Sequence, residues 1–213
     1  MQALLLWATL LCGAPPIADG TLLFLENSNL FVELYTQSET THVAIVLNEA
    51  DQPWVYEATP HEVRKVKLAD YYAELGRMNQ RRSTKSKIRV TMAQPRAPYS
   101  EAQAAAMRAL VDKQLKRRYS IKGYVRGDSD GIHCAELAAR TLCVAEALDL
   151  PRCQDECPAT LLSKVTPLSR PLAVIVIDEP VERPTWCERT TSDWSGFTNW
   201  CQWSCWEAWT FCW

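Results

Sequence analysis

Six short stretches of the chain combine apolar and β-branched residues, which is the pattern of a β-strand. Turn-forming residues separate several of these stretches, as between Asn48 and Pro53 and at Pro60. We therefore predict six strands, over residues 21–25, 42–47, 54–58, 63–68, 87–92 and 172–177.

Helical patterns lie between and after these strands. Ser100 is a favourable N-cap residue, and the stretch that follows it places Met107, Val111 and Leu115 four residues apart. A second helix is predicted to begin at Cys134, after a polar loop. Because the strands come first and the helices are grouped later, without regular alternation, the predicted fold class is α+β. The predicted helices span residues 70–75, 100–118 and 134–148.

The N-terminus reads as an export signal. Residues 3–11 are apolar and too few to span a membrane, and Pro15, Pro16 and the small residue Ala18 follow them. Residues 1–18 contain no Lys or Arg, which is unusual for a signal peptide. Lipidation at Cys12 and a retained N-terminal segment are the alternatives. The prediction is a signal peptide over residues 1–18 and an exported protein, periplasmic or extracellular.

The C-terminus has a different composition. Pro180 and Pro184 punctuate the end of the last strand, so we predict one domain over residues 19–183 and a tail over 184–213. Residues 187–213 contain six tryptophans and four cysteines. Three interpretations stay open: a contact surface for a membrane interface or a sugar polymer, a disulfide-stapled cap, and an unselected extension.

Composition and charge narrow the function classes. With 47% hydrophobic residues the 213-residue chain is not a disordered protein, and its net charge of −2 argues against a generic nucleic-acid partner. The charge is uneven, at −8 over residues 1–63, +13 over 64–126 and −7 over 127–213. The densest basic stretch, residues 77–90, has no aromatic residue for base stacking. We interpret it as a solvated loop and strand start, with an anion-attracting patch as the alternative.

Cys134 is the candidate nucleophile. The unpaired N–H groups and the dipole at a helix N-terminus favour a thiolate, and the same N–H groups can donate to an oxyanion. The competing interpretation is a structural cysteine, because free cysteines are among the most buried residue types.

A cysteine nucleophile needs a base, and the chain has three histidines. His133 adjoins Cys134, but neighbouring side chains at a helix start diverge by about 100°, so His133 is predicted to be poorly aimed. His61 follows Pro60 in a turn, where exposure to solvent is expected. His42 lies on a strand among apolar neighbours, as either a functional partner or a satisfied core histidine.

Glu57 is a carboxylate among apolar residues of the next strand. A buried acid needs a partner, and a hydrogen bond to an imidazole nitrogen would supply one. The alternative is an edge strand that exposes Glu57 to water.

The order of these features resembles a known family. The segments TLLFLE, THVAIVL and VYEAT, a basic hairpin, a long helix and then RYSIKGYVRGDSDGIHCAEL before a final strand are similar to the permuted papain-like amidases of the YiiX/YaeF type, in the NlpC/P60 superfamily. The resemblance spans roughly residues 19–178. Its most specific parts are the early histidine on a strand, the Tyr-Glu pair and the Cys-x-Glu-Leu motif that opens a helix.

The resemblance implies a permuted papain-like fold, with an antiparallel sheet or half-barrel packed against the helix that carries the nucleophile. It implies Cys134 as the nucleophile, His42 as the base and Glu57 as the residue that polarises the histidine. Tyr119 matches a tyrosine that lines the site and is the candidate substrate-binding residue. Glu136 matches the glutamate of the cysteine motif, and we assign it a supporting role.

The chain departs from the family at two positions. Ala135 stands where Ser or Thr is common, and His133 is an unusual neighbour of the cysteine. Neither change removes a chemical role, but both leave the substrate preference open.

The other cysteines are predicted to be structural. Cys143 lies about 180° around the helix from Cys134, so it cannot serve as its resolving partner, and we expect it to be a buried free thiol. Six more cysteines fit three disulfides in an oxidising compartment. Zinc is the alternative for these six, but it would rest on cysteine alone, because no histidine follows residue 133. The six are Cys153, Cys157, Cys187, Cys201, Cys205 and Cys212.

The implied function is a cysteine-dependent hydrolase or acyltransferase that acts on an amide bond, of a peptide or cell-wall type, through an acyl-enzyme. The alternatives are a lipid acyl hydrolase or acyltransferase of the same superfamily, and a non-catalytic secreted binding module. The expected partner is a peptide, cell-wall or lipid-linked acyl substrate, with no metal and no cofactor.

Overall fold

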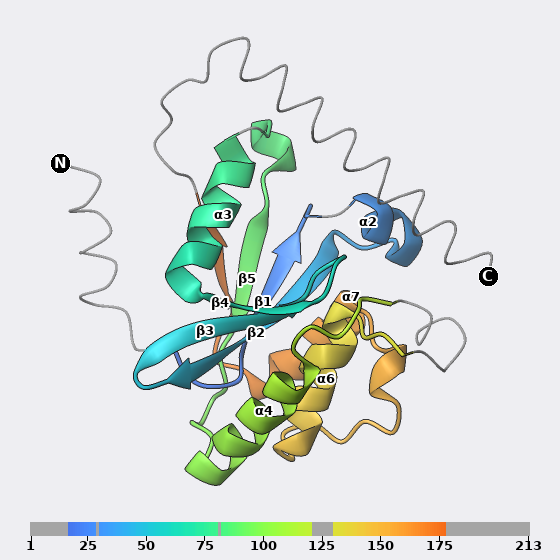
Figure 1. Cartoon of the computed structure of the whole chain (residues 1–213). Coiled ribbons are helices and arrows are strands. Elements are labelled where there is room, and N and C mark those ends of the chain that lie inside the picture. Colours follow the sequence, from blue (N-terminus) through green and yellow to red (C-terminus); the bar gives the residue numbers. More distant parts are fainter. Residues whose placement is uncertain (1–16, 29, 81, 121–129, 178–213) are drawn as a thin grey trace, which may run out of the picture. The chain divides into compact units, whose positions relative to one another are not determined.

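An antiparallel sheet forms the centre of the computed structural model, which describes residues 17–28, 30–80, 82–120 and 130–177 (Figure 1). Its six strands are ordered β4-β3-β2-β1-β5-β6. All five strand pairings are antiparallel, which agrees with the predicted α+β class and antiparallel sheet. The strands are β1 (Thr21–Glu26), β2 (Thr40–Glu49), β3 (Gln52–Ala58), β4 (Val63–Lys67), β5 (Arg89–Ala93) and β6 (Ala173–Val176).

Helices cover both faces of the sheet (Figure 1). On one face, Phe24 and Ile45 belong to a core cluster with residues of α4, α6 and α7. On the other face, Leu23 and Val46 pack with residues of α3. Because both faces are covered, the central strands β1 and β2 carry continuous apolar runs, over residues 22–25 and 43–47, instead of alternating with polar residues. The helices are α2 (Leu30–Thr36), α3 (Leu68–Gln80), α4 (Glu101–Gln114), α6 (Cys134–Val144) and α7 (Pro158–Val165).

The predicted start of α4 is confirmed, but its predicted end is wrong. The Ser100 side chain accepts from the N–H of Gln103, whose side chain in turn accepts from the N–H of Ser100, in a capping box. The helix ends at Gln114 instead of residue 118 because Lys116 adopts a left-handed conformation, with φ 65°. The N–H of Lys116 then donates to the carbonyl of Val63 at 2.9 Å. Sheet pairing therefore replaces the last predicted turn.

The predicted extent of α6 is also too long. The helix begins at Cys134 as expected but ends at Val144, and Glu146 follows with a left-handed φ of 56°. The segment after it turns back toward the helix through the 3₁₀ segment η2 (Cys153–Asp155). Most residues of α6 are buried, so it is a central core helix.

Several predicted features lie wholly or mostly outside the described residues. These are most of the export signal, the domain boundary near residue 183 and the tail over 184–213. Among the helices in the described ranges, none is long and apolar enough to cross a membrane. In the basic stretch, Arg89 pairs with Glu26 and Glu39, and Arg82 donates to backbone carbonyls, so part of its charge serves local structure.

Candidate active site

The candidate site lies where two neighbouring strands stop pairing. The ladder between β2 and β3 ends at Ile45 and Tyr56, whereas each strand continues along its other neighbour. His42 and Glu57 lie just beyond that end, one on each strand. Their side chains therefore meet where no backbone ladder joins the two strands.

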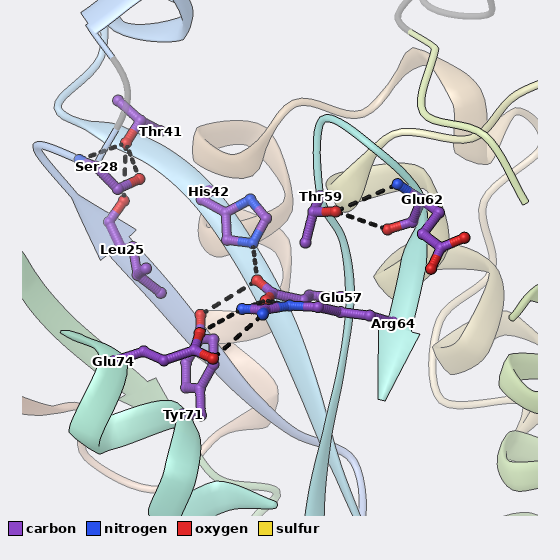
Figure 2. A network of polar contacts seen from close by, with 10 residues as sticks. All are labelled: Leu25, Ser28, Thr41, His42, Glu57, Thr59, Glu62, Arg64, Tyr71 and Glu74. Atoms are coloured by element: carbon purple, nitrogen blue, oxygen red, sulfur yellow. Dashed lines mark hydrogen bonds and ion pairs between the residues drawn. The ribbon is translucent and has the colours of Figure 1, made fainter. Parts of the chain in front are cut away.

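His42 and Glu57 contact each other directly (Figure 2). His42 Nε2 lies 2.6 Å from Glu57 Oε2. The Glu57 side chain is 5% exposed and the His42 side chain 17%, so water weakens this contact little. Because Nε2 is engaged with the carboxylate, Nδ1 is the ring nitrogen left for a second partner.

Residues that the sequence analysis did not single out also hold Glu57. Arg64 of β4 donates from Nε to Glu57 Oε1 at 2.7 Å, and its Nη2 lies 2.7 Å from Glu74 Oε2 of α3. The Tyr71 hydroxyl donates to Glu57 Oε2 at 3.5 Å. Figure 2 shows the Glu57 carboxylate among His42, Arg64 and Tyr71. Glu57 and Arg64 are direct cross-strand partners, so the register of the predicted hairpin could have identified Arg64.

These contacts keep Glu57 ionised in spite of its burial. Burial favours the neutral acid, but the hydrogen bonds and charges of His42 and Arg64 outweigh it and hold the pKa of the Glu57 carboxyl below its usual range. The result is a fixed negative charge behind His42.

Cys134 is the first residue of α6 and is 4% exposed. The segment before it is fixed by a close backbone contact, in which the N–H of Ile132 donates to the carbonyl of Arg118 at 3.0 Å. A Cβ on Gly131 would lie 2.3 Å from the Cβ of Ser120, so only glycine allows this approach. The start of α6 is therefore set by tertiary contacts as well as by local sequence.

His42 and Cys134 shift each other's protonation. Burial acts to lower the pKa of His42, but the charge of Cys134, a hydrogen bond with it and the Glu57 carboxylate raise that pKa to about 10. Burial acts to raise the pKa of Cys134, but the charges of His42 and His133 and hydrogen bonds to both lower it to about 6. Between these values the stable state is a thiolate beside an imidazolium.

The prediction that His133 is poorly aimed is wrong. His133 is the N-cap of α6 with an extended backbone, at φ −101° and ψ 169°, so the rotation of 100° per helical residue does not apply to it. Its Nδ1 accepts from the N–H of Glu136 at 3.3 Å, and its Nε2 donates to the carbonyl of Gln154 at 3.0 Å. Burial lowers the pKa of His133, but the hydrogen bond and charge of Cys134 contribute most to a net rise.

Three other residues were singled out from the sequence: Tyr119, Glu136 and His61. Tyr119 is half-buried, and its backbone bridges to Ile132, two residues before Cys134. Glu136 is buried, with its carboxylate 2.7 Å from Arg140 Nη2 and 3.8 Å from His133 Nε2. His61 is exposed in the turn between β3 and β4, as expected.

Cys143 is a free thiol, as predicted, but the other predictions for the structural cysteines are wrong within the described residues. Cys143 is half-buried instead of buried, and its Sγ lies 3.5 Å from Cys153 Sγ. Cys153 and Cys157, which we expected in disulfides, carry free thiols. The other four predicted disulfide cysteines lie outside the described residues.

Chemically, the cluster combines a buried anionic sulfur, a cationic imidazole beside it and a fixed carboxylate behind the imidazole. The unpaired N–H groups of the first turn of α6 lie at the helix N-terminus, which is also where Cys134 is. They can stabilise a negative charge that develops on a bound carbonyl oxygen. Such a group can attack a carbonyl carbon and transfer a proton to the departing group.

Comparison with known proteins finds a matching family and a similar fold. The sequence profile described as "Permuted papain-like amidase enzyme, YaeF/YiiX, C92 family" matches residues 16–154. Among solved structures, the chain is similar to the crystal structure of the metalloprotein yiiX from Escherichia coli O157:H7. The two share 16% sequence identity with a TM-score of 0.50, over 78% of this chain and 100% of that chain. No curated protein matches the sequence. The likeness to the solved structure concerns the fold alone.

Proposed function

The chain belongs to the permuted papain-like amidases of the YaeF/YiiX type, and on that premise we propose that it is a cysteine-dependent hydrolase or acyltransferase acting on an amide bond. Cys134 is the nucleophile, His42 the acid and base, and Glu57 the residue that orients the imidazole. The observation that carries the proposal is the charge-separated pair of Cys134 and His42, backed by the contact of 2.6 Å between His42 and Glu57.

The proposed reaction begins at the Cys134 sulfur. The Cys134 thiolate forms a bond to the carbonyl carbon, and the carbonyl electrons move to oxygen, which accepts hydrogen bonds at the α6 N-terminus. His42 Nδ1 gives its proton to the amide nitrogen as the carbon–nitrogen bond breaks and the amine leaves. The product is a thioester on Cys134.

Release of the acyl group reverses the proton flow. His42, now neutral, takes a proton from water or from an acceptor amine as that nucleophile attacks the thioester carbon. Collapse of the tetrahedral intermediate expels the Cys134 thiolate and restores the starting ion pair. Throughout, Glu57 accepts from His42 Nε2–H and keeps Nδ1 directed at the reacting atoms.

No step of this reaction needs a metal. The word metalloprotein describes the similar solved structure, and the part of this chain that the structure describes does not form such a site. In the described ranges, no three His, Cys, Asp or Glu side chains converge as metal ligands. Nε2 of His42 is moreover committed to Glu57.

Trapping of the acyl-enzyme tests the proposal. The protein is incubated with a mixed set of peptide amides, cell-wall peptides and lipid esters, and the tryptic peptide that contains Cys134 is examined by mass spectrometry. We expect an acyl adduct from an amide substrate on that peptide. Its rate should fall by about 10²–10⁴-fold in His42→Ala, in line with the usual contribution of a general base.

Matched variants separate chemistry from folding. His61→Ala removes an exposed histidine and Cys157→Ser a half-buried thiol, and both should form the adduct at the parent rate. Acylation by ester lipids alone would make the amidase assignment wrong. Absence of any adduct, together with equal alkylation of Cys134 in the parent and His42→Ala, would make the domain a binding module.

A further inference from the structure

Two thiols outside the candidate active site face each other. Cys143 lies in the last turn of α6 and Cys153 opens η2, and their sulfur atoms are 3.5 Å apart. Both residues are half-buried. Ten residues separate them in sequence, so the contact is made by the connection that folds back onto α6.

The two other cysteines in the described residues, Cys134 and Cys157, are not placed to form a disulfide with Cys143 or Cys153. Cys134 lies nine positions before Cys143 on one straight helix, which separates the two by about 13 Å along the axis, too far for a disulfide. Cys157 caps α7 instead, and its sulfur accepts from the N–H of Thr160 at 3.5 Å. Serine could replace Cys157 in that cap, since its hydroxyl is a preferred N-cap acceptor.

We propose that Cys143 and Cys153 form a reversible disulfide that ties η2 to α6. Bond formation brings the sulfur atoms from 3.5 Å to about 2.05 Å, which a small movement of the η2 segment supplies. The oxidant is a low-molecular-weight organic disulfide. One cysteine thiolate attacks it, forming a mixed disulfide and releasing one thiolate, and the second cysteine then displaces the other thiolate as the protein disulfide closes. The two protein thiols lose two electrons and two protons, and the organic disulfide becomes two thiols.

The contact between the two sulfur atoms disfavours two thiolates at once. Burial and the hydrogen bond with Cys143 raise the pKa of Cys153 to about 12, so Cys153 remains a thiol at neutral pH. One sulfur of the pair therefore attacks first as a thiolate, and the other loses its proton as it closes the bond.

The Cys143–Cys153 disulfide would be linked to the candidate active site through a hydrogen bond. Gln154 follows Cys153 directly, and its carbonyl accepts the hydrogen bond from His133 Nε2 at 3.0 Å. His133 in turn caps α6 and shares a hydrogen bond with Cys134. A disulfide at Cys153 would therefore fix the acceptor that sets the orientation of the His133 ring.

Peptide mapping tests this proposal on the full chain. In a Cys157→Ser parent, trypsin releases Cys143 in the peptide 141–152 and Cys153 in the peptide 153–164, each as its only cysteine. Treatment with oxidised glutathione is expected to join these two peptides, with the loss of two hydrogen atoms. The linked pair should disappear after reduction. It should be absent in Cys143→Ser and in Cys153→Ser, two variants that check each other if one folds poorly.

Thermal unfolding gives a second readout. The oxidised parent should melt roughly 5–10 °C above its reduced form, because the bond constrains the unfolded chain, and Cys143→Ser should not show this rise. Glutathione on either cysteine without a linked peptide, or a link to another cysteine, would overturn the proposal. Cys134 lies on a separate tryptic peptide, so this result does not depend on whether the chain is an amidase.

Discussion

At the scale of single residues, the charge of Glu57 is balanced by two cations of unequal exposure. His42 is largely buried, whereas the Arg64 side chain is 37% exposed and bridges to Glu74 at the surface. Arg64 thus compensates a buried carboxylate without occupying the reaction space beside Cys134.

Removing the Arg64 charge should lower the free energy of unfolding more than removing a similar charge at the surface. We expect Arg64→Met to lower the free energy of unfolding by about 2 kcal/mol, because it leaves the buried Glu57 short of a partner. Arg89→Met, which breaks exposed pairs with Glu26 and Glu39, should cost less than about 1 kcal/mol. Urea unfolding at neutral pH measures both.

The loss of unfolding free energy in Arg64→Met should depend on pH. The folded-state pKa of Glu57 is lowered, so its stabilising contribution is present above the ordinary carboxyl pKa and is lost as pH falls through the folded-state value. The gap between Arg64→Met and the parent should therefore shrink in acid. Equal losses in the Arg64 and Arg89 variants at every pH would contradict this account.

His133 should tune the thiol without being indispensable to it. In His133→Asn the amide oxygen can still cap α6 through the N–H of Glu136, but no imidazole ring shares a hydrogen bond with Cys134. We expect the pKa of Cys134 to rise by roughly one unit, less than in His42→Ala. Thiolate absorbance, taken as the difference from a Cys134→Ser background, measures it. An unchanged pKa would limit His133 to helix capping.

At the scale of secondary-structure elements, the position of Cys134 depends on the close contact between the segments around Ile132 and Arg118. Gly131→Ala should shift this contact, because its methyl group would meet both the Ser120 Cβ and the Arg118 carbonyl. We expect a loss of roughly 1–3 kcal/mol in unfolding free energy and slower alkylation of Cys134. The double variant Gly131→Ala with Ser120→Gly should recover part of both. A single variant that behaves like the parent would mean that the two segments need not approach so closely.

The strands were predictable from sequence because they combine apolar and β-branched residues and because turn-forming residues separate several of them. All six predictions fall on strands, with ends that differ by a few residues. The helix ends were not predictable, because Lys116 and Glu146 adopt left-handed conformations. Lys116 then donates to the sheet at the Val63 carbonyl, whereas the N–H of Glu146 closes a local turn onto the Cys143 carbonyl. Helix α7 was missed although Pro158 stands at its first position, a signal that the cysteine spacing around it obscured.

The candidate site was predictable in part for similar reasons. Cys134 follows a polar loop at a helix start, and Glu57 is an isolated acid in an apolar strand, so both could be found from local pattern. Arg64 and Tyr71 could not be found in this way, since their roles follow from strand register and from the packing of α3 on the sheet. His133 was misjudged because helical geometry was applied to an extended capping residue.

At the scale of the whole molecule, the described chain begins with a segment that is already anchored. The Ile17 carbonyl accepts from the Asn48 side chain at 2.9 Å, and the Ala18 carbonyl accepts from the Thr21 hydroxyl at 2.7 Å. The N–H of Thr21 also donates to the Ala18 carbonyl, at 3.2 Å. We therefore expect a protein starting at Asp19 to be less stable than one starting at Ile17, by about 2–4 kcal/mol for three lost hydrogen bonds. Thermal melting of the two truncations compares them, and equal melting temperatures would show that these contacts contribute nothing.

The central claim is that His42 holds Cys134 as a thiolate, and the pH dependence of Cys134 alkylation by a neutral reagent tests it most directly. In the parent and in the His61→Ala control, the labelling rate should rise with pH about a midpoint near the Cys134 pKa of about 6. In His42→Ala the midpoint should move toward the ordinary thiol value of about 8.5. The same midpoint in all three proteins, or a parent midpoint already at the ordinary value, would contradict the account.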